Sequence, residues 1–433
     1  MSSPRRAMAM VRHGKAAARH PLVFAGKLVA AVVTVAVVST AGIAGIALAD
    51  VTGNVVSHPV VHLVQQDGSS VAKSVSASAL NGEFNMLLVG SDTRTDQGAQ
   101  YSDAADQSAS SGFGNNDVTM LLHVNAAHTA ATVVSFPRDM MVSIPQCPNA
   151  DGGWYDAMSS QMLNSSLSYG GLACPVLTIE NLLGITNINY AAEITFDGVA
   201  AMSNAVGGVP VCLATPLSDP YVGLKLPAGT STLKGQQALE FLRSRHGVDD
   251  GSDLSRISSQ QNFLSSLLRT TTSAGTLANP VKLFQLADAA TKNMTLSDTL
   301  RSSQTMVGMA LALKGIPLSQ ITFVQYPVVA DPTNANRVVP DETEGPVLAQ
   351  AIQKDEPVSL SASTGRGTEL KGGSTASPSP TAASTSTPSP TQTPGGSTPT
   401  STPKPTAVAL GQNATGQTAA EQTCTKGVNA GNF

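Results

Sequence analysis

Short apolar runs and helix-like patterns alternate along residues 83–357 of the chain. The run at 84–90 (FNMLLVG) is typical of a strand that is buried on both faces of a sheet. Further runs of this kind predict strands at 118–124, 131–136, 190–196, 209–213 and 321–326. Apolar positions at helical spacing predict helices at 175–183, 197–206, 235–242, 254–268 and 299–313.

Strands that alternate with helices indicate the α/β fold class. We expect one domain at 83–357, built as three α-β-α layers around a central sheet. A polar turn at 125–129 separates two of the predicted strands, so these two strands are expected to be antiparallel. The central sheet is therefore predicted to be mixed.

The N-terminus has a different pattern, because a basic segment at 1–27 precedes an uncharged stretch at 28–49. About 20 apolar residues suffice for one transmembrane helix. Basic residues stay on the cytoplasmic side, which places the chain after Asp50 outside the cell membrane in a single-pass topology. Ala47-Leu48-Ala49 also fits a signal-peptide cleavage site, but apolar cores of cleaved signals are usually about 7–15 residues long. The pattern favours a retained anchor, and both interpretations make the domain extracellular.

Two polar segments flank the predicted domain. Residues 50–82 are polar and rich in Ser and Ala, which predicts a stalk. Residues 358–433 form a Ser/Thr/Pro-rich tract that cannot bury enough apolar surface to fold, so a disordered tail is predicted there.

Composition excludes some classes of function. Only 12% of the residues are charged and the net charge is −4, which gives no general attraction to nucleic acid. The four cysteines lack CxxC spacing and histidine partners at metal-ligand spacing, so a zinc site is not expected. In an exported chain, Cys147 and Cys174 flank one loop-rich segment, which predicts a disulfide. Cys212 is expected to be a buried thiol, with pairing to Cys424 left open.

Charged residues follow the predicted strands. Asp92 and Arg94 lie in GSDTR (90–94), directly after the first strand. Asp117 opens the second strand, and Arg138 and Asp139 follow the third. The ends of central strands are the usual place for α/β active sites. Taken one at a time, however, each of these motifs is explained better as an ordinary polar loop.

A third cluster is more informative. Arg243 and Arg245 follow the predicted helix at 235–242. Asp253, Arg256 and Gln260 share one side of the next helix with Ile257, Phe263, Leu264, Leu267 and Leu268. This side is polar for two turns and apolar for the next two, which indicates a pocket with a charged mouth and an apolar depth.

The arginines at 243, 245 and 256 suit a ligand rich in phosphate, because guanidinium groups bind phosphate through two hydrogen bonds and stay charged. Asp92 and Asp117 could pair with arginines, or they could hold a hard divalent cation that bridges phosphate oxygens. The sequence has neither a Walker A loop nor a GxGxxG turn, so nothing indicates a nucleotide.

The order of the motifs resembles the LytR-CpsA-Psr family over roughly residues 83–270. The matching segments are NMLLVGSDTR (85–94), DVTM (117–120), VSFPRD (134–139), LN (163–164), YGG (169–171), VGGV (206–209) and GQQALEFLRSRH (235–246), followed by Asp253, Arg256 and Gln260. So many segments in the same order are more specific than any one of them.

The resemblance implies a phosphotransferase of the bacterial cell envelope. It would move a glycopolymer from an undecaprenyl-pyrophosphate carrier in the cytoplasmic membrane to a sugar hydroxyl of peptidoglycan, with Mg²⁺ as cofactor. The resemblance leaves the polymer open: teichoic acid, arabinogalactan or capsule.

The resemblance also assigns roles to residues. Asp92 and Asp117 would bind the metal, and Arg94 would line the mouth of the pocket. The pyrophosphate would be held by Arg138, Arg243, Arg245, Arg256 and Gln260. Leu264 and Leu267 would face the prenyl chain. Asp92 and Asp139 are the candidates for the proton acceptor.

Two alternatives would use the same residues. The first is a regulatory module that binds anionic wall polymers or lipid-linked precursors without catalysis. Acidic residues in an anion-binding pocket are costly unless a metal joins them, which disfavours this alternative. The second is a hydrolase in which water replaces the sugar hydroxyl, and the residues favour neither hydrolase nor transferase.

Overall fold

The computed structural model describes residues 60–71, 82–95, 110, 112–149, 151–273, 280–300, 303–361, 364–372 and 407–428. These residues belong to one compact unit, Val51–Phe433. The predicted cytoplasmic segment (1–27) and transmembrane helix (28–49) lie outside the described residues. Within the described ranges, no helix has both the length and the apolar character needed to cross a bilayer.

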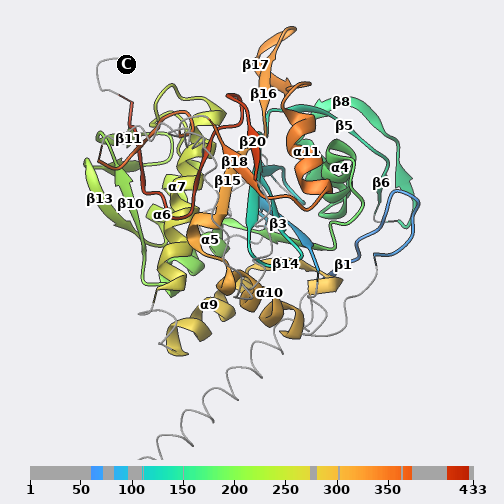
Figure 1. Cartoon of the computed structure of the whole chain (residues 1–433), viewed down its shortest axis with the longest axis horizontal. Helices are drawn as coiled ribbons and strands as arrows, with labels where there is room; N and C mark the ends of the chain where they lie inside the picture. The colour runs from blue at the N-terminus through green and yellow to red at the C-terminus, as the bar shows by residue number, and fades with distance from the viewer. Residues whose placement is uncertain are drawn as a thin grey trace, which may run out of the picture. The chain divides into compact units, whose positions relative to one another are not determined.

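The centre of the domain is an eight-stranded sheet (Figure 1). In spatial order its strands are β1 (Val60–Val61), β14 (Met294–Ser297), β9 (Tyr190–Ile194), β2 (Phe84–Ser91), β3 (Asn116–Val124), β4 (Ala131–Phe136), β15 (Ile321–Gln325) and β21 (Gly416–Thr418). The pairs β1–β14, β9–β2 and β4–β15 are parallel, and the other neighbouring pairs are antiparallel. The predicted mixed sheet is therefore confirmed.

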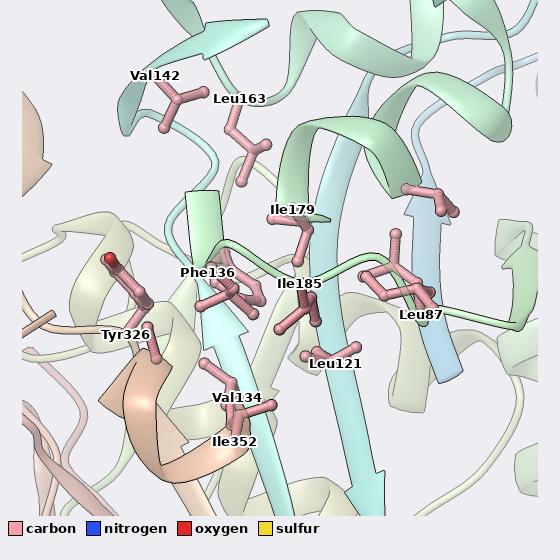
Figure 2. Packing of buried hydrophobic residues seen from close by; sticks show 14 of the residues in the cluster. Leu87, Leu121, Val134, Phe136, Val142, Leu163, Ile179, Ile185, Tyr326 and Ile352 are labelled. Carbon is pink, nitrogen blue, oxygen red and sulfur yellow. The ribbon is translucent and has the colours of Figure 1, made fainter. Parts of the chain in front are cut away.

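Alternate residues of the central strands point to opposite faces, and helices cover both faces. On one face, Leu87, Leu121 and Val134 pack against α4 (Ala173–Leu183) and α11 (Gly345–Gln353). Figure 2 shows Ile179 of α4 and Ile352 of α11 close to these strand residues. On the other face, Phe84, Val124 and Phe323 pack against α10 (Ser303–Gly315) and against α7 (Asp253–Thr272). Burial on both faces explains why these strands are almost continuously apolar.

A second core lies on the far side of α7. Its four-stranded sheet has the order β13 (Gly229–Leu233), β10 (Val209–Leu213), β22 (Thr423–Thr425) and β19 (Thr368–Leu370). Val209 and Val211 of β10 pack with Phe241 of α6 (Gln236–Arg243) and with Phe263 of α7. Helix α7 is thus buried between two sheets, and 12 of its residues are buried.

The other helices are α3 (Ser165–Gly170), α5 (Phe196–Ala205) and α9 (Pro280–Lys292), with short 3₁₀ turns η2 (Asp298–Leu300) and η3 (Leu318–Gln320). The remaining strands form pairs: β5 (Met141–Ile144) with β8 (Met158–Met162), β6 (Cys147–Pro148) with β7 (Trp154–Tyr155), β11 (Leu217–Asp219) with β12 (Leu224–Leu226), β16 (Val328–Asp331) with β17 (Asn334–Pro340), and β18 (Val358–Leu360) with β20 (Val408–Leu410).

The prediction of a disordered tail at 358–433 is wrong for the described part of that segment. Strand β21 extends the central sheet by pairing with β15, and β22 pairs with β10 and β19. Leu410, Ala414 and Ala419 are buried. Strands β21 and β22 form because neighbouring strands supply their hydrogen-bond partners, although neither strand is an apolar run of its own.

The predicted stalk at 50–82 also needs correction. Strand β1 joins the edge of the central sheet, and Leu63 and Val71 are buried in the main core. The domain therefore includes residues 60–71, upstream of the predicted start at Glu83.

Both pairs of cysteines form disulfides. Cys147 and Cys174 are bonded with a Cα–Cα distance of 5.2 Å, so this predicted pair is confirmed. The expectation of a buried thiol at Cys212 is wrong, because Cys212 is bonded to Cys424. These two residues are register partners on β10 and β22, which brings their side chains together.

Candidate functional site

One cavity, with a volume of about 450 Å³, gathers most of the residues predicted to bind the ligand. It lies where the ends of β2, β3 and β9 meet helices α5, α6 and α7. Its polar lining includes Asp117, Arg138, Arg243, Arg245, Arg256 and Gln260. Its apolar lining includes Phe263, Leu264, Leu267, Phe196, Val199 and Met202.

Helix α7 supplies both parts of this lining. Its N-terminus is capped by Ser252, whose side chain accepts a hydrogen bond from the backbone N–H of Ser255. Arg256 and Gln260 lie in the first two turns and line the polar part, whereas Leu264 and Leu267 lie in the next two turns. The structure therefore brings together the polar and apolar halves of the stripe that the sequence predicts.

Asp117 reaches the cavity from a β-bulge. Gly90 pairs with Val118 and Ser91 pairs with Asn116, so Asp117 is an extra residue in β3. Bulges redirect side chains and are common beside active sites. The Asp117 carboxylate accepts a hydrogen bond from Arg138 Nη1 at 2.7 Å, and its other oxygen lies 3.9 Å from Arg256 Nη1.

Asp253 completes a network of alternating charges with these residues. Its Oδ1 lies 2.5 Å from Arg256 Nη2 and 3.6 Å from Arg138 Nε. Burial lowers the pKa of Arg138, but Asp117, Asp253 and Asp139 outweigh burial and raise it above the ordinary value. Arg138 therefore stays charged, because a buried charge is tolerated when partners of opposite charge lie beside it.

Arg243 and Arg245 are held differently. The Arg243 guanidinium lies over the Phe196 ring, 4.6 Å from its centroid. The carboxylate of Asp219 fixes the loop after α6, because it accepts hydrogen bonds from the backbone N–H groups of Arg245 and Gly247. Within the described ranges, neither arginine has a carboxylate within 4.0 Å. Both cations therefore face the cavity without a neutralising acid, which favours an anionic ligand.

Three predicted site residues, Asp92, Arg94 and Asp139, are not part of the cavity lining. Asp92 Oδ1 accepts hydrogen bonds from Asn115 N at 2.6 Å and Ser110 Oγ at 2.7 Å. Arg94 donates its backbone N–H to Ser110 O. Asp139 lies 3.5 Å from Arg138 Nε. Burial and Asp253 raise the pKa of Asp139, while the neighbouring arginines offset this only in part.

Asp92 and Asp117 were predicted to hold a metal ion. Asp92 Oδ2 receives only a long hydrogen bond of 3.4 Å from Asn115 Nδ2, which leaves it available to a cation. Among the described residues, neither Asp92 nor Asp117 belongs to a group of three or more acidic, histidine or cysteine side chains whose ligand atoms converge. Mg²⁺ is commonly bound by one or two carboxylates, with water and substrate phosphates completing its shell. Carboxylates are ligands that suit Mg²⁺, but in this structure both Asp117 oxygens lie beside arginines and Asp92 lies outside the cavity lining.

Sequence patterns missed several residues of the cavity. Phe196 supports Arg243, and Asp219 orients the loop that carries Arg245. Asp219 is 1% exposed, yet it lies on the short strand β11, where no periodic pattern predicted an element. Phe196 ended a predicted strand, and only the fold shows that it begins α5 beside α6.

The fold and the cavity define an α/β protein with an arginine-rich pocket that has an apolar extension. The model of the LytR_cpsA_psr family matches residues 56–353, and the chain belongs to this family. The match begins upstream of Glu83, in agreement with the corrected start of the domain.

Curated relatives include the cell wall biosynthesis protein LcpA of Corynebacterium glutamicum, which is 32% identical over 272 residues, 58% of this chain and 51% of that protein. The teichoic acid transferase TagT of Bacillus subtilis is 27% identical over 249 residues, 56% of this chain and 69% of that protein. The chain spans about half the length of LcpA.

Solved structures share the fold. Protein gbs0355 of Streptococcus agalactiae superposes with a TM-score of 0.52 at 23% identity, covering 66% of this chain and 91% of that chain.

Proposed function

We propose that this protein is a phosphotransferase that moves a glycopolymer from an undecaprenyl-pyrophosphate carrier to a sugar hydroxyl of peptidoglycan during cell-wall assembly. Family membership supports the proposal, as do the relatives, one named a cell wall biosynthesis protein and another a polyisoprenyl-teichoic acid–peptidoglycan teichoic acid transferase. The observation that carries it is the position of Arg243 and Arg245. Without an acidic partner in the described part of the chain, they face a cavity whose depth is apolar.

The charges of the cavity suit a pyrophosphate diester. Four arginines (138, 243, 245 and 256) and two aspartates (117 and 219) line it, which leaves a net charge of about +2. A pyrophosphate diester carries about two negative charges, so ligand and lining would neutralise one another. The prenyl chain would then lie along Phe263, Leu264 and Leu267, where burial of apolar surface stabilises it.

In the proposed reaction, the sugar oxygen attacks the phosphorus atom next to the polymer. A new O–P bond forms while the bond to the bridging oxygen breaks, and undecaprenyl phosphate leaves with that oxygen. Phosphoryl transfer depends mainly on positioning and charge neutralisation, which the arginines provide. The hydroxyl proton passes to a carboxylate. Asp139 is one candidate because its raised pKa makes it a stronger base than an ordinary aspartate, and Asp92 is the other.

Mg²⁺ is the proposed cofactor, held by Asp92 and Asp117, and it would add positive charge at the phosphate oxygens. Arg94 follows Thr93 in the segment after β2 and would border the mouth of the cavity.

We also propose that the chain is anchored in the cytoplasmic membrane by residues 28–49, with the domain outside. The two disulfides support this location, because disulfides persist in oxidising compartments.

The proposal is tested by incubating the full-length protein with a labelled lipid-linked glycopolymer, with and without peptidoglycan. A transferase should move label to peptidoglycan and release undecaprenyl phosphate only when the acceptor is present. Release without acceptor would identify a hydrolase. Saturable binding without any release would identify the regulatory module, and either result would overturn the proposal.

A further inference from the structure

A second group of ligand-type side chains lies at the other end of the central sheet. His123 is near the end of β3, Glu83 directly precedes β2, and Asp355 follows α11. His123 and Asp117 are six positions apart on β3, which corresponds to about 20 Å along a strand. This group, the Glu83–His123–Asp355 cluster, is therefore separate from the arginine-rich cavity.

The three side chains converge. One ligand atom from each of Glu83, His123 and Asp355 lies within 4.8 Å of the others. The His123 side chain is 2% exposed, and its Nε2 lies 3.3 Å from Asp355 Oδ1. Neither of these two atoms has a hydrogen-bond partner in the described structure, although both are buried. A buried polar atom without a partner is costly, so this pair requires a physical explanation.

The position of the ring proton on His123 makes the contact between Nε2 and Asp355 Oδ1 harder to explain. Its Nδ1 lies 2.9 Å from Asn85 Oδ1, its register partner on β2. An amide oxygen only accepts, so Nδ1 must carry the proton and donate. In a neutral imidazole, Nε2 then has a bare lone pair, and that lone pair faces a carboxylate oxygen. Such an arrangement is repulsive unless a metal ion or a second ring proton lies between the two atoms.

Hydrogen bonds from neighbouring residues fix the orientation of the side chains in the cluster. The backbone N–H of Ala126 donates to Asp355 Oδ2 at 2.9 Å, which leaves Oδ1 for the cluster. Asn187 Nδ2 donates to Glu83 Oε1 at 2.6 Å. Partners of this kind around histidine and carboxylate ligands are a regular feature of metal sites, because they fix the tautomer and the orientation of each ligand.

We propose that Glu83, His123 and Asp355 form a binding site for a divalent cation of the zinc class. Tetrahedral zinc with bonds of about 2.1 Å places its ligand atoms about 3.4 Å apart, close to the 3.3 Å between His123 Nε2 and Asp355 Oδ1. One imidazole and two carboxylates suit Zn²⁺ better than Mg²⁺, which prefers oxygen ligands only. The cation would tie the segment after α11 to strands β2 and β3.

The experiment uses full-length protein that has been freed of metal by chelation. Binding of Zn²⁺ is measured by competition with a chromophoric chelator, and Mg²⁺ serves as the comparison ion. The wild type should bind one Zn²⁺ at this site and unfold at a higher temperature when the ion is present. Asp355→Asn is the informative variant, since its amide oxygen can still accept from Ala126 N–H and Asn tolerates the positive φ of 58° at this position.

Asp355→Asn and Glu83→Gln each alter a proposed metal ligand, so each should weaken Zn²⁺ binding. Loss of a residue that only hydrogen-bonds to a metal ligand costs roughly 10–100-fold in affinity, and the change of a ligand should cost at least as much. Glu342→Gln, an exposed acid outside the cluster, should bind Zn²⁺ as the wild type does. Unchanged Zn²⁺ affinity in both cluster variants, or no saturable binding by the wild type, would overturn the site. The cluster would then be a contact between His123 and Asp355 that involves no metal ion.

Discussion

Cys212 and Cys424 are bonded to one another across neighbouring strands, although 212 positions separate them in the chain. Their Cα atoms are 4.4 Å apart. This bond attaches strand β22, and with it the last described segment of the chain, to the sheet that packs on α7. The C-terminal strands are thus a structural part of the domain that carries the arginine-rich cavity.

Loss of this bond should destabilise the domain. The double variant Cys212→Ala/Cys424→Ala is expected to lower the free energy of unfolding by about 2–5 kcal/mol, because the unfolded chain regains the freedom of a very long loop. Denaturant unfolding under oxidising conditions measures the loss. Under reducing conditions that break both disulfides, the double variant and the wild type should become similar. A variant as stable as the oxidised wild type would contradict a structural role of the bond.

Arg243→Ala and Arg245→Ala should each remove a two-point contact with phosphate. The expected cost is about 2–4 kcal/mol of transition-state stabilisation, or roughly a 30- to 900-fold loss in kcat/KM. The measurement is the rate of transfer from a labelled lipid-linked polymer. Arg366→Ala is the matched control, because Arg366 is exposed and pairs with Asp250 away from the cavity. Losses below threefold in both cavity variants would mean that these arginines do not contact the reacting phosphate.

Asp92→Ala tests the proposed Mg²⁺. If Asp92 supplies a metal ligand, the variant should bind a prenyl pyrophosphate weakly and show the same affinity with Mg²⁺ or with chelator, whereas chelation should weaken binding by the wild type. Titration of a prenyl pyrophosphate under both conditions measures this, with Asp331→Ala in the β16–β17 hairpin as the control. Tighter binding by Asp92→Ala, independent of metal, would show that the carboxylate only repels the anion and would favour the regulatory module.

Glu180 should make the stability of the domain depend on pH. Burial raises the pKa of this α4 residue from 4.5 to about 7. Between these values the folded state binds more protons than the unfolded state, so stability falls as pH rises through this window. Glu180→Gln removes the charge, and its stability relative to the wild type should improve by up to about 3 kcal/mol between pH 5 and pH 8. Urea unfolding at both pH values measures it, with exposed Glu342→Gln as the control. A difference independent of pH would contradict the raised pKa.

The sequence predicts the central elements well, and the reason is physical. Strands β2, β3 and β4 are buried on both faces, so each appears as an apolar run with clear ends. Strands β21 and β22 (GQT and TCT) have no such run. Their stability comes from β15, β10 and the bond to Cys212, which are partners distant in sequence. No local pattern could therefore indicate that these two strands form.

The residues of the candidate site also differ in whether the sequence could predict their contacts. Helical periodicity fixes which residues of α7 share a side, so the pairing of Arg256 and Gln260 with Leu264 and Leu267 could be predicted. The contact of Asp117 with Arg138 depends on a β-bulge, and the support of Arg245 by Asp219 depends on a loop. Both are tertiary arrangements. For the same reason the sequence could not show that Asp92 lies outside the lining whereas Asp117 lies within it.

The apolar depth of the cavity yields the last prediction. Leu264 and Leu267 line the cavity and are only partly buried, so their side chains are available to a ligand. The double variant Leu264→Gln/Leu267→Gln should weaken binding of undecaprenyl pyrophosphate by about 1–3 kcal/mol, because it removes apolar surface against which the prenyl chain packs. Geranyl pyrophosphate presents the same charged group with a much shorter chain, and its affinity should change less.

The ratio of the two affinities is therefore the quantity to measure, since it cancels any general effect on the arginine-rich mouth. Leu311→Gln is the matched control, because Leu311 lies on α10 and is 62% exposed. It should leave the ratio at the wild-type value. Circular dichroism confirms that each variant is folded before binding is measured. If the double variant keeps the wild-type preference for the long chain, the prenyl chain does not lie along α7, and the cavity would accommodate a different part of the substrate.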